Sequence, residues 1–214
     1  MRPLLVTGFE PFGGDAINPS GDVARTLHRR KIGGAPVIGL VLPCRFGASL
    51  DALRSAIATH RPQLVLALGL AAGRAELSLE RVAINLDDAR IADNASAQPV
   101  DTPVVPGAPA ALFTTLPIKA MVAAMCDAGH PAGLSLSAGS FVCNHVFYGL
   151  LHALRRRRGV RGGFMHLPCL PEQVSPGSDT PALPLHTMVD GVVVALETAL
   201  ATQTDLAQPG GSIA

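Results

Sequence analysis

A cysteine, a histidine and a glutamate stand in three separate segments whose patterns indicate chemistry. Cys143 opens the stretch 144–157, whose apolar residues recur at helical spacing. A thiol at a helix N-terminus feels the positive end of the helix dipole and unpaired backbone N–H groups, which both favour the nucleophilic thiolate. The same N–H groups can hold an oxyanion. Cys143 is therefore a candidate nucleophile, although a cysteine is more commonly a small buried hydrophobe.

His166 lies near the end of the apolar run 163–167, just before Pro168. Such a run predicts a buried strand, and binding sites of open α/β sheets form at the carboxyl ends of strands. His166 is thus a candidate general base. A core histidine that bonds to the backbone is the alternative, and the segment alone leaves both open.

Glu80 begins the stretch 80–86, which is otherwise mostly apolar. If residues 79–86 form one strand, the Glu80 side chain lies on the same face as Val82, Ile84 and Leu86. A carboxylate on an apolar face is costly unless it has a partner. Catalysis would supply one, and so would a salt bridge to Arg74, Arg81 or Arg90. A bulge could instead turn Glu80 outward.

The loop Gly8-Phe9-Glu10-Pro11-Phe12-Gly13-Gly14 follows the first predicted strand. Its glycines permit tight turns, but their pattern is neither a P-loop nor a dinucleotide fingerprint. The chain has few aromatic residues, so Phe9 and Phe12 on one loop indicate the wall of an apolar pocket. A plain strand-to-helix connection is the alternative.

These residues need a fold that brings the three segments together. Buried strands are predicted at 4–7, 36–42, 64–68 and 163–167, and helices at 20–30, 48–60, 118–128, 144–157 and 185–201. The alternation predicts a three-layer α/β/α sandwich around a largely parallel, mixed sheet. We expect one catalytic α/β domain over 1–207, a long loop at 93–109 and a flexible C-terminal tail at 208–214.

Composition excludes several function classes. Charged residues make up 15% of the chain and the formal net charge is +1. The chain therefore has no strong overall positive charge of the kind that attracts a nucleic acid. No signal peptide and no membrane-spanning stretch is visible, and we expect a cytoplasmic protein without membrane contact. The four cysteines lack C-x-x-C spacing and do not cluster with histidines, which predicts free thiols and no metal site.

Four blocks of the sequence, in this order, resemble the pyroglutamyl-peptidase I family of cysteine peptidases. The blocks are Val6-Thr7-Gly8-Phe9-Glu10-Pro11-Phe12-Gly13-Gly14 with Asn18-Pro19-Ser20; Glu80-Arg81-Val82-Ala83 with Asp87-Asp88-Ala89-Arg90-Ile91; Ser140-Phe141-Val142-Cys143-Asn144 with Val146-Phe147-Tyr148; and Gly163-Phe164-Met165-His166-Leu167-Pro168 with Leu170-Pro171-Glu172-Gln173.

The resemblance implies that Cys143, His166 and Glu80 form a catalytic triad that removes an N-terminal pyroglutamyl residue from peptides, without a cofactor. It also implies a homotetramer. The substrate pocket that it implies has Phe9 and Phe12 around the lactam ring, Asn18 nearby, Arg90 close to the oxyanion, and an apolar wall of Phe141, Val142 and Ile91.

One segment departs from the family pattern. Members commonly carry Gly-Gln-Ala-Gly-Gly-Arg, whereas this chain has Gly69-Leu70-Ala71-Ala72-Gly73-Arg74. Leu70 cannot make the hydrogen bonds of the glutamine that it replaces. The alternatives are therefore a related cysteine amidase with another lactam or acyl specificity, and a non-catalytic homologue. Cys44 is expected at the pocket side.

Overall fold

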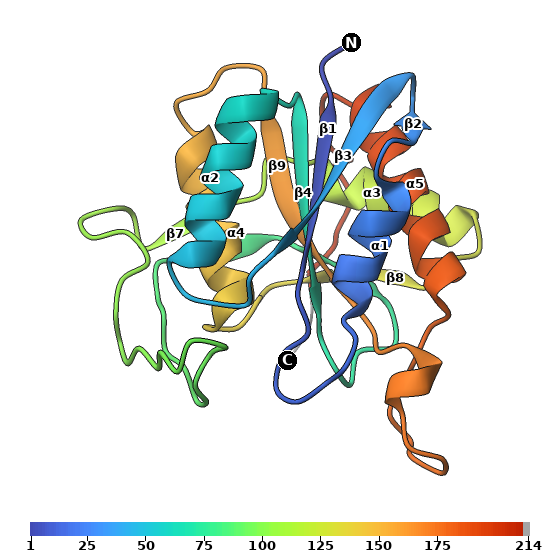
Figure 1. Ribbon diagram of the computed structural model, residues 1–214. Helices are drawn as coiled ribbons and strands as arrows, with labels where there is room; N and C mark the ends of the chain where they lie inside the picture. Colours follow the sequence, from blue (N-terminus) through green and yellow to red (C-terminus); the bar gives the residue numbers. More distant parts are fainter. Residues whose placement is uncertain (212–214) are drawn as a thin grey trace.

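A twisted sheet of seven strands forms the centre of the structure, a computed structural model that describes residues 1–211 (Figure 1). Its strands lie in the order β2 (Lys31–Ile32), β3 (Ala35–Leu42), β1 (Leu4–Phe9), β4 (Leu64–Leu70), β9 (Arg161–Leu167), β5 (Leu77–Glu80) and β8 (Ala132–Ser135). The strands β3, β1, β4 and β9 are parallel to one another, as their continuous apolar runs predict.

Two strand pairs make the sheet mixed. The edge strand β2 is antiparallel to β3, and β5 is antiparallel to β9, while β8 runs parallel to β5. The antiparallel pairing of β5 with β9 matters for function, because these two strands carry Glu80 and His166.

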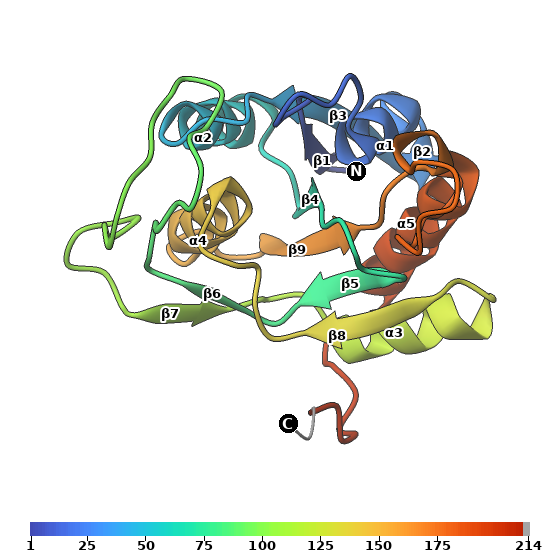
Figure 2. The ribbon, with the colours of Figure 1, turned by 90° about the horizontal axis from the view of Figure 1, so that it is seen from below.

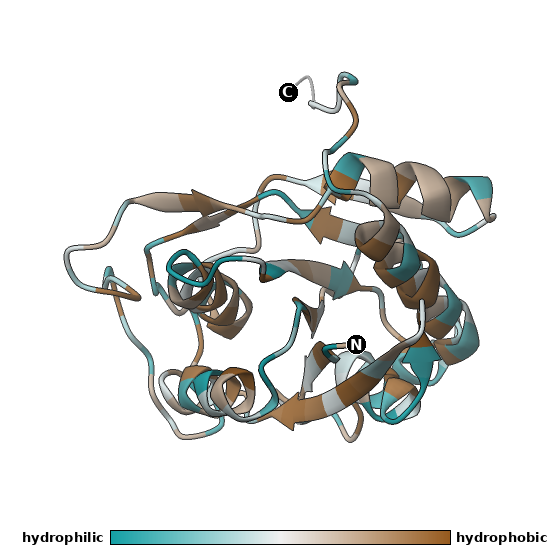
Figure 3. Ribbon diagram, turned by 90° about the horizontal axis from the view of Figure 1, so that it is seen from above, coloured by the Kyte–Doolittle hydropathy of each residue, from teal (hydrophilic) through white to brown (hydrophobic). Residues whose placement is uncertain are grey.

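Helices cover both faces of the sheet and complete the three predicted layers (Figure 2). One face packs against α1 (Pro19–Leu27), α3 (Ile118–Asp127) and α5 (Leu185–Ala201), and the other packs against α2 (Ala48–His60) and α4 (Val142–Leu154). Residues alternate between the two cores along each strand: Leu4 and Val6 face α1, whereas Leu5 faces α2. Apolar residues, brown in Figure 3, accordingly dominate the central strands and the helices that cover them.

Residues 79–86 do not form the single strand that was considered for Glu80, because the backbone changes partners at Arg81. The Arg81 N–H donates to the Ser135 carbonyl, whereas the Arg81 carbonyl accepts from Thr114. Beyond this point β6 (Val82–Ile84) pairs with β7 (Ala111–Phe113) in a separate two-stranded sheet. Glu80 is therefore fully buried while Ile84 is 36% exposed, so the two side chains do not share one apolar face.

The remaining connections include the expected long loop, since residues 93–109 contain no helix or strand. A 3₁₀ turn, η1 (Pro171–Gln173), follows β9. Within residues 1–211 no helix has both the length and the apolar character to cross a bilayer. In the predicted tail, the Gln208 carbonyl accepts a hydrogen bond from Lys119 Nζ on α3, and residues 212–214 lie outside the described part.

Asn144 fastens the first turn of α4 to β6 and so fixes where Cys143 lies. Its side-chain Oδ1 accepts from the Ile84 N–H at 3.0 Å, and its Nδ2 donates to the carbonyls of Ile84 and Leu86, both at 2.9 Å. The side chain is buried, so water cannot easily replace these three bonds.

We therefore expect Asn144→Ala to lower the free energy of unfolding by about 2–4 kcal/mol, because it removes the three hydrogen bonds that the buried amide makes to backbone groups of Ile84 and Leu86. Asn94→Ala is the matched control, since the amide of Asn94 also donates two hydrogen bonds but is exposed. Its loss should be below about 1 kcal/mol. Urea denaturation of both variants measures the difference, and equal losses would contradict the role given to Asn144.

Candidate active site

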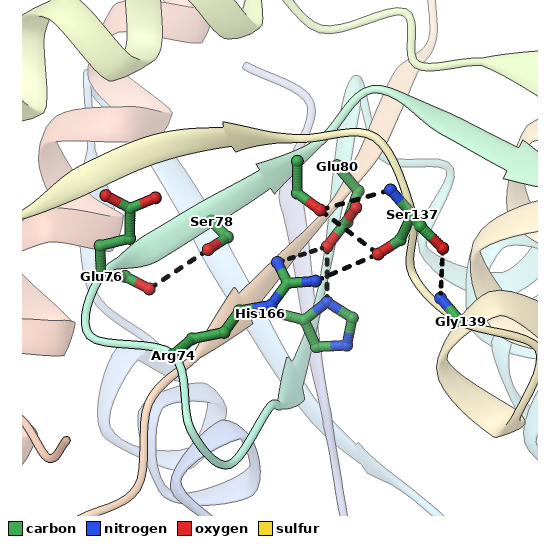
Figure 4. A network of polar contacts seen from close by, with 8 residues as sticks. Arg74, Glu76, Ser78, Glu80, Ser137, Gly139 and His166 are labelled. Carbon is green, nitrogen blue, oxygen red and sulfur yellow. Dashed lines mark hydrogen bonds and ion pairs between the residues drawn. The ribbon is translucent and has the colours of Figure 1, made fainter. Parts of the chain in front are cut away.

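Glu80 and His166 meet because β5 and β9 are neighbours. Ser78 lies opposite His166 in the antiparallel ladder, and Glu80, two residues further on, lies on the same face of the sheet. The Glu80 Oε1 atom is 2.7 Å from His166 Nδ1, and both side chains are buried (Figure 4). The carboxylate can only accept, so Nδ1 carries the ring proton and Nε2 is free to accept another.

The same carboxylate oxygen also accepts a hydrogen bond from an arginine. Arg74 Nη1 lies 2.8 Å from Glu80 Oε1, and Arg74 Nη2 donates to the Ser137 carbonyl at 3.1 Å. Of the two interpretations that the sequence left open, salt bridge and histidine partner, the structure contains both.

Burial by itself would raise the pKa of the Glu80 carboxyl. The hydrogen bond and charge of His166, the Ser135 hydroxyl and the charge of Arg74 outweigh this effect and lower that pKa below its ordinary value. Glu80 is therefore ionised at neutral pH. For His166 burial is the largest influence, and together with the charge of Arg74 it lowers the pKa of the imidazole although Glu80 acts in the opposite direction. The ring is neutral at neutral pH and can accept a proton.

Cys143 is the second residue of α4, and its side chain points toward the sheet at Gly69, which has no side chain. Gly69 on β4 pairs with His166 on β9, and its position has no side chain to occupy this space. A methyl group at Gly69 would lie 2.8 Å from Cys143 Sγ and 2.8 Å from Phe164 Cζ, closer than atoms can pack. The absence of a side chain at Gly69 thus allows the thiol to lie beside His166.

The thiol is at the helix N-terminus as predicted, but its surroundings oppose the predicted thiolate. Burial raises the pKa of the Cys143 thiol far above its ordinary value, and Cys44 and Glu80 raise it further, while Arg74 opposes them. Between residues 1 and 211 no hydrogen bond joins Sγ to the His166 ring. Burial thus favours the protonated thiol although the residue is only half-buried, and the neutral ring of His166 can accept its proton.

A pocket of about 270 Å³ opens in front of Cys143 and His166. It is lined by these two residues together with Phe9, Phe12, Asp15, Asn18, Cys44, Leu70, Ala138 and Phe141. The ring centroids of Phe12 and Phe141 are 5.1 Å apart, and Phe46 packs against Phe141 at 5.2 Å in an edge-on arrangement. Aromatic rings thus form one wall of a small, mostly apolar site.

The predicted pocket residues divide into two groups. Phe9, Phe12, Asn18 and Phe141 line the pocket, as do the predicted Leu70 and Cys44. The amide of Asn18 is largely occupied within the protein, since Oδ1 accepts from the N–H of Ser20 at the start of α1 and Nδ2 donates to the Glu10 carbonyl.

Arg90, Ile91 and Val142 do not line this pocket. Arg90 and Ile91 are exposed on the loop after β6, and Val142 is buried in the core under α4. Sequence analysis missed Asp15 and Ala138, which do line it. Asp15 directly follows the predicted aromatic loop, but only the fold shows that it lines the same pocket as Cys143.

Known proteins of one family match this chain over almost its whole length. Residues 2–202 match the sequence profile of the pyroglutamyl peptidase family. A pyrrolidone-carboxylate peptidase from Erwinia tasmaniensis is 53% identical over 212 residues, which cover 99% of both chains. One from Cupriavidus taiwanensis is 54% identical over 215 residues, which cover 100% of both.

Solved structures agree with these relatives. The crystal structure of pyroglutamyl peptidase I from Bacillus amyloliquefaciens superposes with a TM-score of 0.93 at 42% identity, covering 96% of this chain and 100% of that one. Pyrrolidone carboxyl peptidase from Thermococcus litoralis gives a TM-score of 0.95 at 36% identity, covering 98% and 100%.

We expect Gly69→Ala to lower kcat/KM about 100-fold, because the added methyl group displaces Cys143 Sγ from its position beside His166. Gly162→Ala is the matched control: it adds a methyl group on β9 that would meet Leu154 Cδ1 at 2.6 Å, under the other end of α4. Thermal denaturation and steady-state kinetics of both variants separate packing strain from loss of the thiol's position. Unchanged kcat/KM for Gly69→Ala would contradict this geometry.

Proposed function

Because this chain belongs to the pyroglutamyl peptidase family, we propose that it hydrolyses the amide bond after an N-terminal pyroglutamyl residue with Cys143 as nucleophile, His166 as base and Glu80 as its orienting partner. The observation that carries the proposal is the buried Glu80–His166 pair beside the thiol in one aromatic pocket. The protein is a cysteine-type hydrolase.

The first half of the reaction forms a thioester. As Cys143 Sγ attacks the pyroglutamyl carbonyl carbon, the thiol proton passes to His166 Nε2, and the carbonyl oxygen becomes an oxyanion. The first backbone N–H groups of α4 have no partner within the helix, so they can donate hydrogen bonds to this oxygen. When the intermediate collapses, the C–N bond breaks and His166 gives the proton to the leaving amine.

The second half returns the enzyme to its resting state. His166 takes a proton from water, the hydroxide attacks the thioester carbonyl, and the departing Cys143 sulfur is reprotonated. Glu80 holds the proton on Nδ1 and stabilises the imidazolium that forms in each half. The neutral resting pair fits this cycle, because every proton taken up by the ring comes from the attacking group.

The pocket accounts for selection of a neutral cyclic residue. A pyroglutamyl group lacks the charged α-amine of glutamate, and a small pocket walled by Phe12 and Phe141 would leave such a charge poorly solvated. The substrates we propose are therefore peptides with an N-terminal pyroglutamyl residue.

Cys143 is the residue on which the proposed chemistry depends. Cys143→Ala should lower hydrolysis of a chromogenic pyroglutamyl amide by roughly a thousandfold or more, because it removes the sulfur that forms the acyl-enzyme. Cys126→Ala, which removes an exposed thiol on α3, serves as the control and should keep full activity. Turnover by Cys143→Ala at the rate of the control would rule out the mechanism.

Leu70 supports a second candidate function, a cysteine amidase for another lactam or acyl group. Its apolar side chain lines the pocket and offers no hydrogen bond to a lactam. The sequence-based expectations of a homotetramer and of a cytoplasmic location remain predictions beside both candidates.

A panel of amides separates the two candidates. We expect pyroglutamyl amide to have the highest kcat/KM, ahead of prolyl, acetyl and six-membered lactam amides, because the pocket volume and the aromatic wall fit a flat five-membered ring. A non-pyroglutamyl amide preferred by about tenfold or more would favour the second candidate.

A further inference from the structure

We propose that Arg74 is a positioning residue of this active site, which shares the Glu80 carboxylate with His166 and ties it to the segment that leads to Cys143. The inference rests on the proposed function for its kinetic consequences but not for its geometry. No earlier step of the mechanism assigns Arg74 a role.

The contacts of Arg74 join three elements of the site (Figure 4). It lies between β4 and β5, and its guanidinium reaches Glu80 on β5 and the Ser137 carbonyl between β8 and α4. The Ser137 side chain in turn accepts from the Gly139 N–H at 3.1 Å, and this turn leads directly to the first residue of α4. One planar group thus holds both the carboxylate and the approach to the nucleophile.

The arrangement at Glu80 is unusual in that one oxygen has two donors. Arg74 Nη1 and His166 Nδ1 both lie on Oε1, whereas Oε2 has no hydrogen-bond partner within residues 1–211. The Glu80 side chain is fully buried and that of Arg74 is 28% exposed, so solvent screens this ion pair only partly. The two donors divide the negative charge of one oxygen, and this weakens the attraction between Glu80 and an imidazolium.

The other groups around the ring give the sign of this effect. The ring of His166 is bonded to Glu80 on β5, and Arg74 bonds to the same carboxylate. The other titratable residues in the lining of the pocket are Cys143, Cys44 and Asp15. Among these described groups only Arg74 adds a positive charge. It lowers the pKa of His166 and, in the same direction, that of the Cys143 thiol. Arg74 therefore keeps the imidazole neutral to a lower pH than Glu80 alone would allow.

The test is the titration of His166 in the intact protein and in Arg74→Met, which keeps the length of the side chain but not its charge or donors. The imidazole proton resonance of His166, identified by its loss in His166→Gln, should titrate at a pH higher by roughly 1 unit in Arg74→Met. The acid limb of kcat/KM should move upward by the same amount, because the ring must be neutral to accept a proton.

Arg81→Met is the matched control, because Arg81 follows Glu80 in the chain and its side chain makes no ion pair with a described residue. It should leave both the resonance and the acid limb unmoved. Arg74→Lys retains the charge, so it should keep the titration near that of the original protein. Arg74→Gln, which also lacks the charge, replaces Arg74→Met in the comparison if that variant does not fold.

An unmoved or lowered His166 titration in Arg74→Met would overturn the proposal and leave Arg74 a structural ion pair. The proposal would also be overturned if the His166 titration moved as far in Arg74→Lys, which keeps the charge, as in Arg74→Gln, which does not. The resonance is measured without substrate, so a protein that fails to hydrolyse pyroglutamyl amides would refute the proposed function while this titration still decides the role of Arg74.

Discussion

A carboxylate buried inside a protein must be given hydrogen-bond donors, and Glu80 imposes this constraint on the whole site. Its side chain has no contact with solvent, and its donors are the ring of His166 and the guanidinium of Arg74. The antiparallel pairing of β5 with β9 brings the first donor into reach, and the turn after β4 brings the second. The sheet topology and the geometry of the site are in this sense one arrangement, since a sheet without that pairing would leave Glu80 without its histidine donor.

The same burial determines the resting state of the nucleophile. The Cys143 sulfur packs so close to Gly69 that a methyl group there would meet it at 2.8 Å, and the desolvation of this half-buried residue opposes the effect of the helix terminus on the thiol. A neutral thiol beside a neutral imidazole stores no charge in an apolar pocket. In the proposed mechanism the charges arise only during attack, when Glu80 and the N–H groups of α4 would stabilise them.

Local patterns predicted much of this structure, and contacts between distant segments account for what they missed. Helices α2 and α5 begin and end at the predicted residues, because helical periodicity is a property of adjacent turns. Whether residues 79–86 form one strand could not be read from the segment itself, because its partners, Ser135 and Thr114, lie far away in the chain. Isolated residue types could not show whether Glu80 pairs with an arginine or a histidine, and the resemblance to the family resolved this toward the histidine while the structure contains both. Arg90, Ile91 and Val142 matched family positions, but this chain's own loops and core keep them away from the pocket.

The central claim is that the Glu80–His166 pair acts on a thiol that is neutral at rest. The most direct measurement is the ultraviolet absorbance of the thiolate, taken as the difference between the protein and its Cys143→Ser variant, from about pH 5 to about pH 9. The structure predicts that no thiolate signal from Cys143 develops through neutral pH in the absence of substrate, because burial raises the pKa of this thiol. A full thiolate signal at or below neutral pH would show a preformed thiolate–imidazolium pair and would contradict the account.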